Sequence, residues 1–125
     1  MTRCPCRTIA EAKPYARCCG PYHEGRAIPD TPVALMRSRY SAYALQSRQY
    51  LLDTWHASTR PADLSLERAT EWLSLKVHTT TVDGDNGTVA FTAKLRENGK
   101  VGTLSETSRF VREDGRWFYV DGAVS

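Results

Sequence analysis

All four cysteines of this chain lie in its first nineteen residues, where their spacing could support metal, disulfide or redox chemistry. One residue separates the first two and the last two are adjacent: Cys4, Cys6, Cys18 and Cys19. Zinc prefers four tetrahedral ligands, and these thiolates would supply four from the two ends of one loop. The spacing differs from the common zinc knuckle, in which two residues separate paired cysteines, so all three kinds of chemistry stay open at this point.

The redox compartment narrows these alternatives. The first residues lack the apolar stretch of a secretory signal, and no apolar run approaches the ~18 residues that span a bilayer, so we expect a cytoplasmic protein without a membrane partner. Reducing compartments disfavour disulfides and favour thiol clusters that bind metal. We therefore expect one Zn²⁺ bound by the four cysteines. Two alternatives stay open: His23 in place of one cysteine, or disulfides and free thiols.

A zinc site with four protein ligands is closed to substrate, so the expected ion is structural and folds the module around it. That module spans residues 1–29 and is rich in loops, because proline and glycine interrupt it throughout. Its basic side chains would surround the site on the surface: Arg3, Arg7, Lys13, Arg17 and Arg26. They could contact an acidic protein or a ribonucleoprotein partner, or they could only keep a module with little core in water. The net charge of +3 does not decide between the two.

Three helices are predicted after this module. The first spans 32–47, because Thr31 offers an N-cap, Pro32 suits the first helical position, and apolar residues follow at helical spacing. The stretch RQYLLDTWH, residues 48–56, predicts a second, short helix. A third helix is predicted from Leu64 to Trp72, after a cap at Asp63.

Beyond Trp72 the apolar period changes to two, which predicts four strands. They are LSLKVHTTTV, TVAFTAKL, TLSETSRFVR and RWFYVDG. The separators DGDNG, NGK and EDG contain residues that tolerate positive φ and suit tight hairpins. Helices followed by strands, without alternation, predict an α+β domain over 30–125, in which a curved antiparallel sheet of about four strands packs on the helices.

Five segments together resemble the YchJ family of small bacterial proteins, in the same order and over nearly the whole chain. They are CPC…CCGPYHEG, LMRSRYSAYAL, YLLDTWHASTRP, EWLSLKV and SRFVREDGRWFYVDG. The resemblance implies a SEC-C zinc-binding motif in 1–29 and a SnoaL-like cone domain, cystatin-like and related to nuclear transport factors, in 30–125. It also implies that the four cysteines are the zinc ligands, although the loop between Cys6 and Cys18 is longer than in the usual motif.

A cone domain of this kind encloses a pocket between its helices and the concave sheet face, as the resemblance implies. The candidate lining residues are Tyr40, Trp55, His56, Glu106 and Arg109. Side chains alternate along a strand, so Glu106 and Arg109 face opposite sides unless a bulge intervenes. Glu106 near His56 could be a general base, or the pair could be a structural hydrogen bond that holds the second helix on the sheet.

Two functional hypotheses from different classes result. The first is a zinc-binding adaptor that acts through a protein or ribonucleoprotein partner. The second is a small-molecule binding protein or enzyme that uses the pocket, with His56 and Glu106 as its polar groups. A pocket filled by aromatic side chains favours the first, and a hollow with convergent titratable groups favours the second. Because folds of this kind often pair sheet to sheet, a homodimer is a further expectation.

Overall fold

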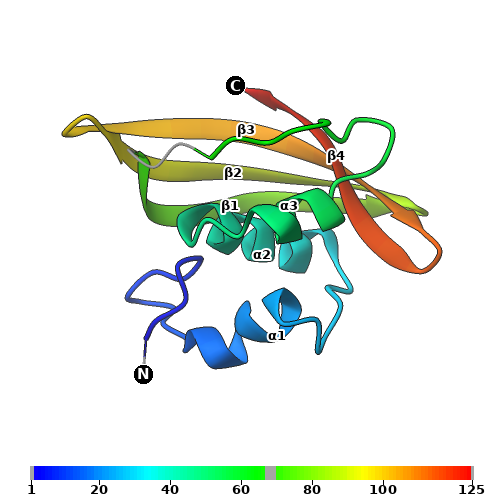
Figure 1. Cartoon of the computed structure of the whole chain (residues 1–125), viewed down its shortest axis with the longest axis horizontal. Helices are drawn as coiled ribbons and strands as arrows, with labels where there is room; N and C mark the ends of the chain where they lie inside the picture. Colours follow the sequence, from blue (N-terminus) through cyan, green and yellow to red (C-terminus); the bar gives the residue numbers. More distant parts are fainter. Residues whose placement is uncertain (1, 67–69, 125) are drawn as a thin grey trace.

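The computed structural model describes residues 2–66 and 70–124 and arranges them in three layers (Figure 1). A four-stranded antiparallel sheet forms the first layer, and helices α2 (Pro32–Ala44) and α3 (Arg48–Asp53) lie against one of its faces. The N-terminal residues form the third layer, on the side of α2 away from the sheet. The predicted α+β architecture is confirmed.

Helix α2 begins where the sequence predicts. The Thr31 hydroxyl accepts a hydrogen bond of 3.0 Å from the backbone N–H of Ala34, and Pro32 occupies the first turn, where its missing N–H costs nothing. The helix ends at Ala44, before the predicted end at residue 47, because Gln46 takes a left-handed φ of 58° that a helix cannot contain.

Helix α3 is also shorter than the predicted stretch 48–56, because the chain after it pairs with a strand. The backbone N–H of His56 donates to the Tyr119 carbonyl at 2.7 Å, and the Tyr119 N–H donates to the Thr54 carbonyl at 2.8 Å. These two bonds fix the segment after α3 along the last strand of the sheet. The helix therefore stops at Asp53.

The predicted third helix, 64–72, is wrong in the residues that the structure describes. Residues 64–66 have no regular structure, strand β1 (Thr70–Asp83) begins at Thr70, and residues 67–69 lie outside the described part. Trp72 pairs with Leu95 of the neighbouring strand, and a register irregularity follows before Ser74. Cross-strand pairing over a long sheet outweighs helical spacing over a single short stretch.

The four strands form a simple meander in the order β1-β2-β3-β4, with β2 (Asn86–Glu97), β3 (Lys100–Glu113) and β4 (Arg116–Val124) following β1. Tight two-residue turns explain why the strands are longer than predicted. Asn98 and Gly99 take φ of 51° and 78°, and Asp114 and Gly115 take 54° and 80°. Two successive positive φ values are typical of the type I′ turn, whose twist matches that of the paired strands.

One sheet face packs on α2 and forms the core. Val89, Phe91 and Ala93 alternate along β2 and are buried, as the period of two predicts, and Leu35 and Met36 of α2 pack on the same cluster. The other face is polar. On it, exposed His78 bonds to the Thr92 hydroxyl at 2.7 Å.

The N-terminal layer contains a short 3-10 helix, η1 (Tyr15–Arg17), and one turn of helix, α1 (Gly20–His23). An antiparallel bridge between Arg3 and Pro14 closes the loop between the two cysteine pairs, and Ile9 at its tip is 85% exposed. The extra length of this loop therefore projects outward. Among the described residues, every helix is too short or too polar to cross a membrane.

A close approach between α2 and the sheet, at Gly87, yields a prediction. A Cβ atom at Gly87 of β2 would lie 2.5 Å from Cγ of Pro32, so Gly87→Ala should separate α2 from the sheet and destabilise the fold by about 1–3 kcal/mol. Gly102→Ala in β3 is the matched control, because no atom lies within 4 Å of its added Cβ. Urea unfolding measures both, and equal effects of the two substitutions would contradict this packing.

Candidate metal centre and ligand cavity

The four cysteine sulfurs converge beneath α2. The backbone N–H of Cys4 donates to the Lys13 carbonyl at 2.8 Å, which folds the loop back so that both ends meet. Cys18 and Cys19 immediately precede α1, and their sulfurs face the first pair. All four Sγ atoms lie within 4.8 Å of one another, in a largely buried site.

The spacing of these sulfurs fits one tetrahedral ion. A Zn–S bond of about 2.3 Å places the sulfurs of a tetrahedral site ~3.8 Å apart. Sγ of Cys6 lies 3.7 Å from that of Cys4, 3.5 Å from that of Cys18 and 3.7 Å from that of Cys19. A disulfide requires about 2.05 Å, and all four cysteines are free. The four residues together could hold a metal ion.

Donor groups surround the sulfurs. The guanidinium of Arg7 donates from Nε to Sγ of Cys18 at 3.4 Å, and the hydroxyl of Ser41 in α2 lies 3.3 Å from Sγ of Cys4 and 3.2 Å from Sγ of Cys19. Such outer contacts orient metal ligands and offset thiolate charge. Ser41 also ties the cluster directly to α2.

The side chain of His23 is engaged outside the sulfur cluster. Its Nε2 lies 2.7 Å from the Ser38 carbonyl of α2, and its Nδ1 lies 2.7 Å from the Tyr15 hydroxyl. A carbonyl can only accept, so Nε2 carries the proton and Nδ1 accepts from the tyrosine. Both ring nitrogens therefore have partners other than a metal ion, which supports the four-cysteine set over the alternative with His23.

The thiols of Cys6 and Cys19 hold protons that a metal ion must displace, because the pKa of each is raised. Hydrogen bonds with Cys4 and Cys6, together with burial, raise the pKa of the Cys19 thiol. Metal binding to such a cluster releases protons, so its affinity falls as the pH falls.

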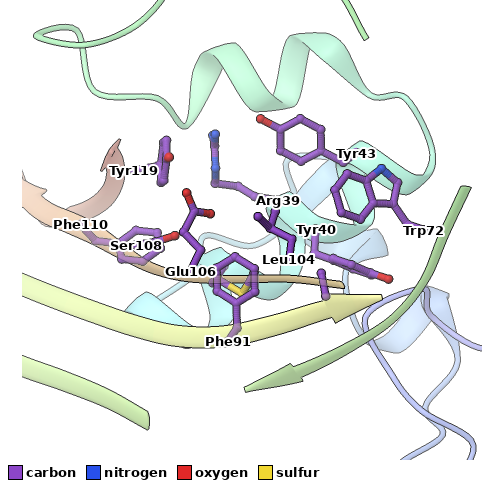
Figure 2. Close-up of a pocket in the computed structure, with 12 residues that line it drawn as sticks. Arg39, Tyr40, Tyr43, Trp72, Phe91, Leu104, Glu106, Ser108, Phe110 and Tyr119 are labelled. Atoms are coloured by element: carbon purple, nitrogen blue, oxygen red, sulfur yellow. The ribbon is translucent and has the colours of Figure 1, made fainter. Parts of the chain in front are cut away.

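A cavity of about 300 Å³ lies on the opposite side of α2, between the helix and the inner face of the sheet (Figure 2). Half of its lining residues are aromatic: Tyr40, Tyr43, Trp72, Phe91, Phe110 and Tyr119. Arg39, Glu106 and Ser108 are the polar groups of the lining besides the tyrosine hydroxyls. The cavity is thus a hollow with convergent titratable groups rather than a space filled by side chains.

Arg39 of α2 is the buried cation of this cavity, with 5% of its surface exposed. Its Nη1 donates to the Leu51 carbonyl at 2.8 Å and to the Thr54 hydroxyl at 2.7 Å. The guanidinium carbon lies 4.3 Å from the ring centroid of Tyr119 and 4.9 Å from that of Trp55. Burial lowers the pKa of Arg39 to about 10, so the group is still charged at neutral pH.

Glu106 of β3 projects toward Arg39 from the sheet (Figure 2). Burial raises the pKa of this carboxyl above its ordinary value. Gly122 of β4 gives it room, because a Cβ at that position would collide with the carboxyl group of Glu106. The position of the carboxylate thus depends on a glycine in the neighbouring strand.

The structure brings only some of the predicted pocket residues together. Tyr40 and Glu106 line the cavity, whereas Trp55 stands behind Arg39, with its ring 5.0 Å from that of Tyr119. His56 and Arg109 lie elsewhere, because His56 follows the edge of β4 and Arg109 alternates to the outer side of β3. The structure does not bring His56 and Glu106 together: His56 contacts Glu113 and Ser58, whereas Glu106 projects into the cavity.

His56 and Arg109 instead line an open hollow on the outer side of β3. Nε2 of His56 lies 2.6 Å from the Glu113 carboxylate, and Nδ1 lies 2.7 Å from the Ser58 hydroxyl. Arg109 makes two hydrogen bonds, of 2.6 and 2.5 Å, to the Asp121 carboxylate. The backbone N–H of Ser58 also donates to Nδ1 of His56, at 3.1 Å, so the half-buried His56 side chain stabilises the turn after α3.

Sequence reasoning missed two side chains of α2 that lie at the candidate sites, Arg39 in the cavity and Ser41 beside the cysteines. A signal for Arg39 was present: it lies three residues after Met36 and four before Tyr43, on the stripe that faces the sheet. A charged residue on an apolar stripe indicates a buried cation. Nothing in the sequence marked Ser41 as a neighbour of the cysteines, because that contact joins residues far apart in the chain.

The model of the YchJ middle NTF2-like domain matches residues 31–122. This chain belongs to the YchJ family. A UPF0225 protein of Polaromonas naphthalenivorans is 52% identical to this YchJ-family chain over 132 residues, which cover 97% of this chain and 96% of the relative. A UPF0225 protein of Ralstonia nicotianae is 48% identical over 135 residues, covering 98% and 91%. The predicted family is confirmed.

Two solved structures share the fold of this YchJ-family chain. The solution structure of a SEC-C motif containing protein from Rhodopseudomonas palustris has a TM-score of 0.88 and 32% identity, and it covers 99% of both chains. The crystal structure of a SEC-C motif containing protein from Psychrobacter arcticus has a TM-score of 0.83 and 26% identity, with 100% of this chain and 84% of that chain covered. Both alignments include the cysteine module as well as the sheet.

The raised pKa of Glu106 predicts a pH-dependent stability. Because the folded state favours the protonated carboxyl, the stability that this group contributes is complete below its unfolded pKa and is lost as the pH rises through the folded one. Glu106→Gln should therefore stabilise the protein at pH 7 relative to the unchanged chain, and stabilise it less at pH 4. Urea unfolding at both pH values measures this difference.

The control is Glu113→Gln, which removes an exposed carboxylate outside the cavity and should give no gain at pH 7. A loss of more than about 2 kcal/mol in Glu106→Gln would contradict the account, because it would show that the carboxylate belongs to a structural hydrogen-bond network.

Proposed function

We propose that this YchJ-family protein is a small-molecule binding protein of the cytoplasm, whose N-terminal cysteines hold one structural Zn²⁺. The observation that carries the binding function is the cavity of about 300 Å³, which is aromatic and contains two opposed ionisable groups, Arg39 and Glu106. Ligand sites typically combine an apolar wall with a few polar groups that fix orientation. Because the cavity is hollow, it favours ligand binding over a pure adaptor role, for which we would expect a filled core.

Zinc is the metal that suits the cysteine cluster. Four thiolates at tetrahedral spacing are typical of structural zinc or iron–sulfur sites, and the sulfurs here surround a single position rather than a larger cluster. Free cysteines in a reducing cytoplasm would be available as ligands. We therefore assign Cys4, Cys6, Cys18 and Cys19 as the four ligands of one closed site, with no catalytic role.

The zinc-binding adaptor is the second candidate. Its support is the N-terminal layer itself, on which Arg3, Lys13, Arg17 and Arg26 are exposed together with Ile9. A protein or ribonucleoprotein partner could bind there, and a second copy of the chain could bind at the polar sheet face. This role would be favoured if the protein captures one partner from a lysate and the capture is lost when the metal is chelated.

The zinc assignment predicts one equivalent of zinc per chain and a tetrahedral all-thiolate spectrum after cobalt substitution. Cys19→Ser should lose the metal, because its sulfur lies within reach of the other three. Removing the ion should lower the unfolding temperature strongly, since metal binding to such motifs contributes on the order of 10 kcal/mol. Elemental analysis and thermal unfolding measure the two effects.

The matched variant is His23→Gln, which should keep the full equivalent of zinc because both ring nitrogens bind protein groups. A cobalt spectrum of three sulfurs and one imidazole would contradict the assignment. So would a metal-free protein with two disulfides after purification under reducing conditions.

The binding function predicts that small flat organic molecules enter the cavity of the zinc-loaded protein. We expect a set of neutral, anionic and cationic ring compounds to shift the NMR signals of Phe91, Ser108 and Phe110, which line the cavity from β2 and β3. Signals of the outer face, such as His78, should not move. If no compound in the set shifts the cavity signals, the binding function is wrong.

A further inference from the structure

We infer that the cavity binds a small monocarboxylate with a flat apolar body, and that the guanidinium of Arg39 pairs with its carboxylate. This inference rests on the proposed binding function and names the class of ligand. It is carried by a cation that the fold buries in the cavity wall without a carboxylate at ion-pairing distance anywhere in residues 2–66 and 70–124.

The hydrogen bonds of Arg39 leave part of its guanidinium available. Five N–H groups lie on its planar fork, and Nη1 donates to the Leu51 carbonyl at 2.8 Å and the Thr54 hydroxyl at 2.7 Å. The guanidinium lies in the cavity between Tyr119 and Tyr43 (Figure 2). A carboxylate can accept from such a fork through both of its oxygens.

The surroundings of Arg39 compensate only part of its buried charge. The rings of Tyr119 and Trp55, at 4.3 and 4.9 Å from the guanidinium carbon, offer cation–π contacts. Such contacts offset only part of the cost of removing a charge from water. Glu106 projects toward Arg39 but forms no ion pair with it in residues 2–66 and 70–124, so an anionic ligand would offset the rest.

The opposite wall limits the charge of that anion. Glu106 projects toward the same space from β3 and would repel a second negative charge, so a phosphate dianion or a dicarboxylate fits less well than a monocarboxylate. The body of the ligand would contact the aromatic wall, where the rings of Tyr40 and Trp72 meet edge to face at 5.8 Å. About 300 Å³ suits a molecule of one or two rings.

Arg39 could also serve only to hold α3 and β4 on α2, since it bonds to Leu51 and stacks on Tyr119. The two roles predict different ligand preferences. A purely structural arginine gives no preference for negative charge, whereas a receptor for carboxylates does.

The experiment compares three probes that share an indole ring and differ in charge: indole-3-acetate, indole-3-acetamide and tryptamine. Binding to the zinc-loaded full chain is followed by NMR shifts of cavity residues and by calorimetry. We expect the acid to bind at least tenfold more tightly than the amide, and the amine to bind least.

Variants assign this preference to Arg39. Arg39→Met should abolish the preference for the acid over the amide, while the control Arg109→Met, on the outer side of the same sheet, should keep it. Glu106→Gln leaves the contacts of Arg39 intact and should tighten binding of the acid and weaken that of the amine. This second variant tests the inference even where Arg39→Met does not fold.

Equal affinities for acid and amide, or tightest binding of the amine, with shifts at the cavity, would overturn the carboxylate inference and leave the binding function standing. Absence of cavity shifts with all three probes would also overturn the inference. In that case the wider set of ring compounds proposed above decides whether the cavity binds ligands at all.

Discussion

The structure depends on one constraint: helix α2 must bury both of its sides at once. On one side, Ser41 contacts two cysteine sulfurs, and the Arg37 guanidinium donates to the Cys6 carbonyl at 2.8 Å. On the other side, Met36 and Arg39 face the sheet and line the cavity. Neither the cysteine module nor the sheet has a large core of its own, so the helix between them joins both into one packed unit.

The proposed metal site and the cavity would therefore have different roles on opposite sides of the same helix. A closed tetrahedral site adds binding free energy to folding and leaves no position for a substrate. The cavity has the opposite effect on stability, because it keeps a cation out of water and the desolvation of that cation costs free energy of folding. In this account the metal centre stabilises the helix that holds Arg39 in place, and the sheet supplies the opposing carboxyl of Glu106.

Much of this arrangement could be predicted from local sequence signals. The cap at Thr31, the hairpin turns at Asn98 and Asp114, and the alternation along β2 each have a short-range physical cause, and each is present in the structure. The rest depends on partners distant in the chain. Thr70 to Trp72 end a stretch with a helical period but pair with β2, and His56 bonds to Glu113, 57 positions further along the chain. Local patterns cannot specify such partners.

Hydrogen exchange along α2, measured with zinc bound and after chelation, tests most directly whether the cysteine module holds this helix. Chelation should speed exchange in the N-terminal residues and also along α2, because the contacts of Ser41, Arg37 and Ser38 with the module are lost together. An increase confined to residues 2–29, with α2 as protected as before, would contradict this expectation. The helix would then be held by the sheet alone.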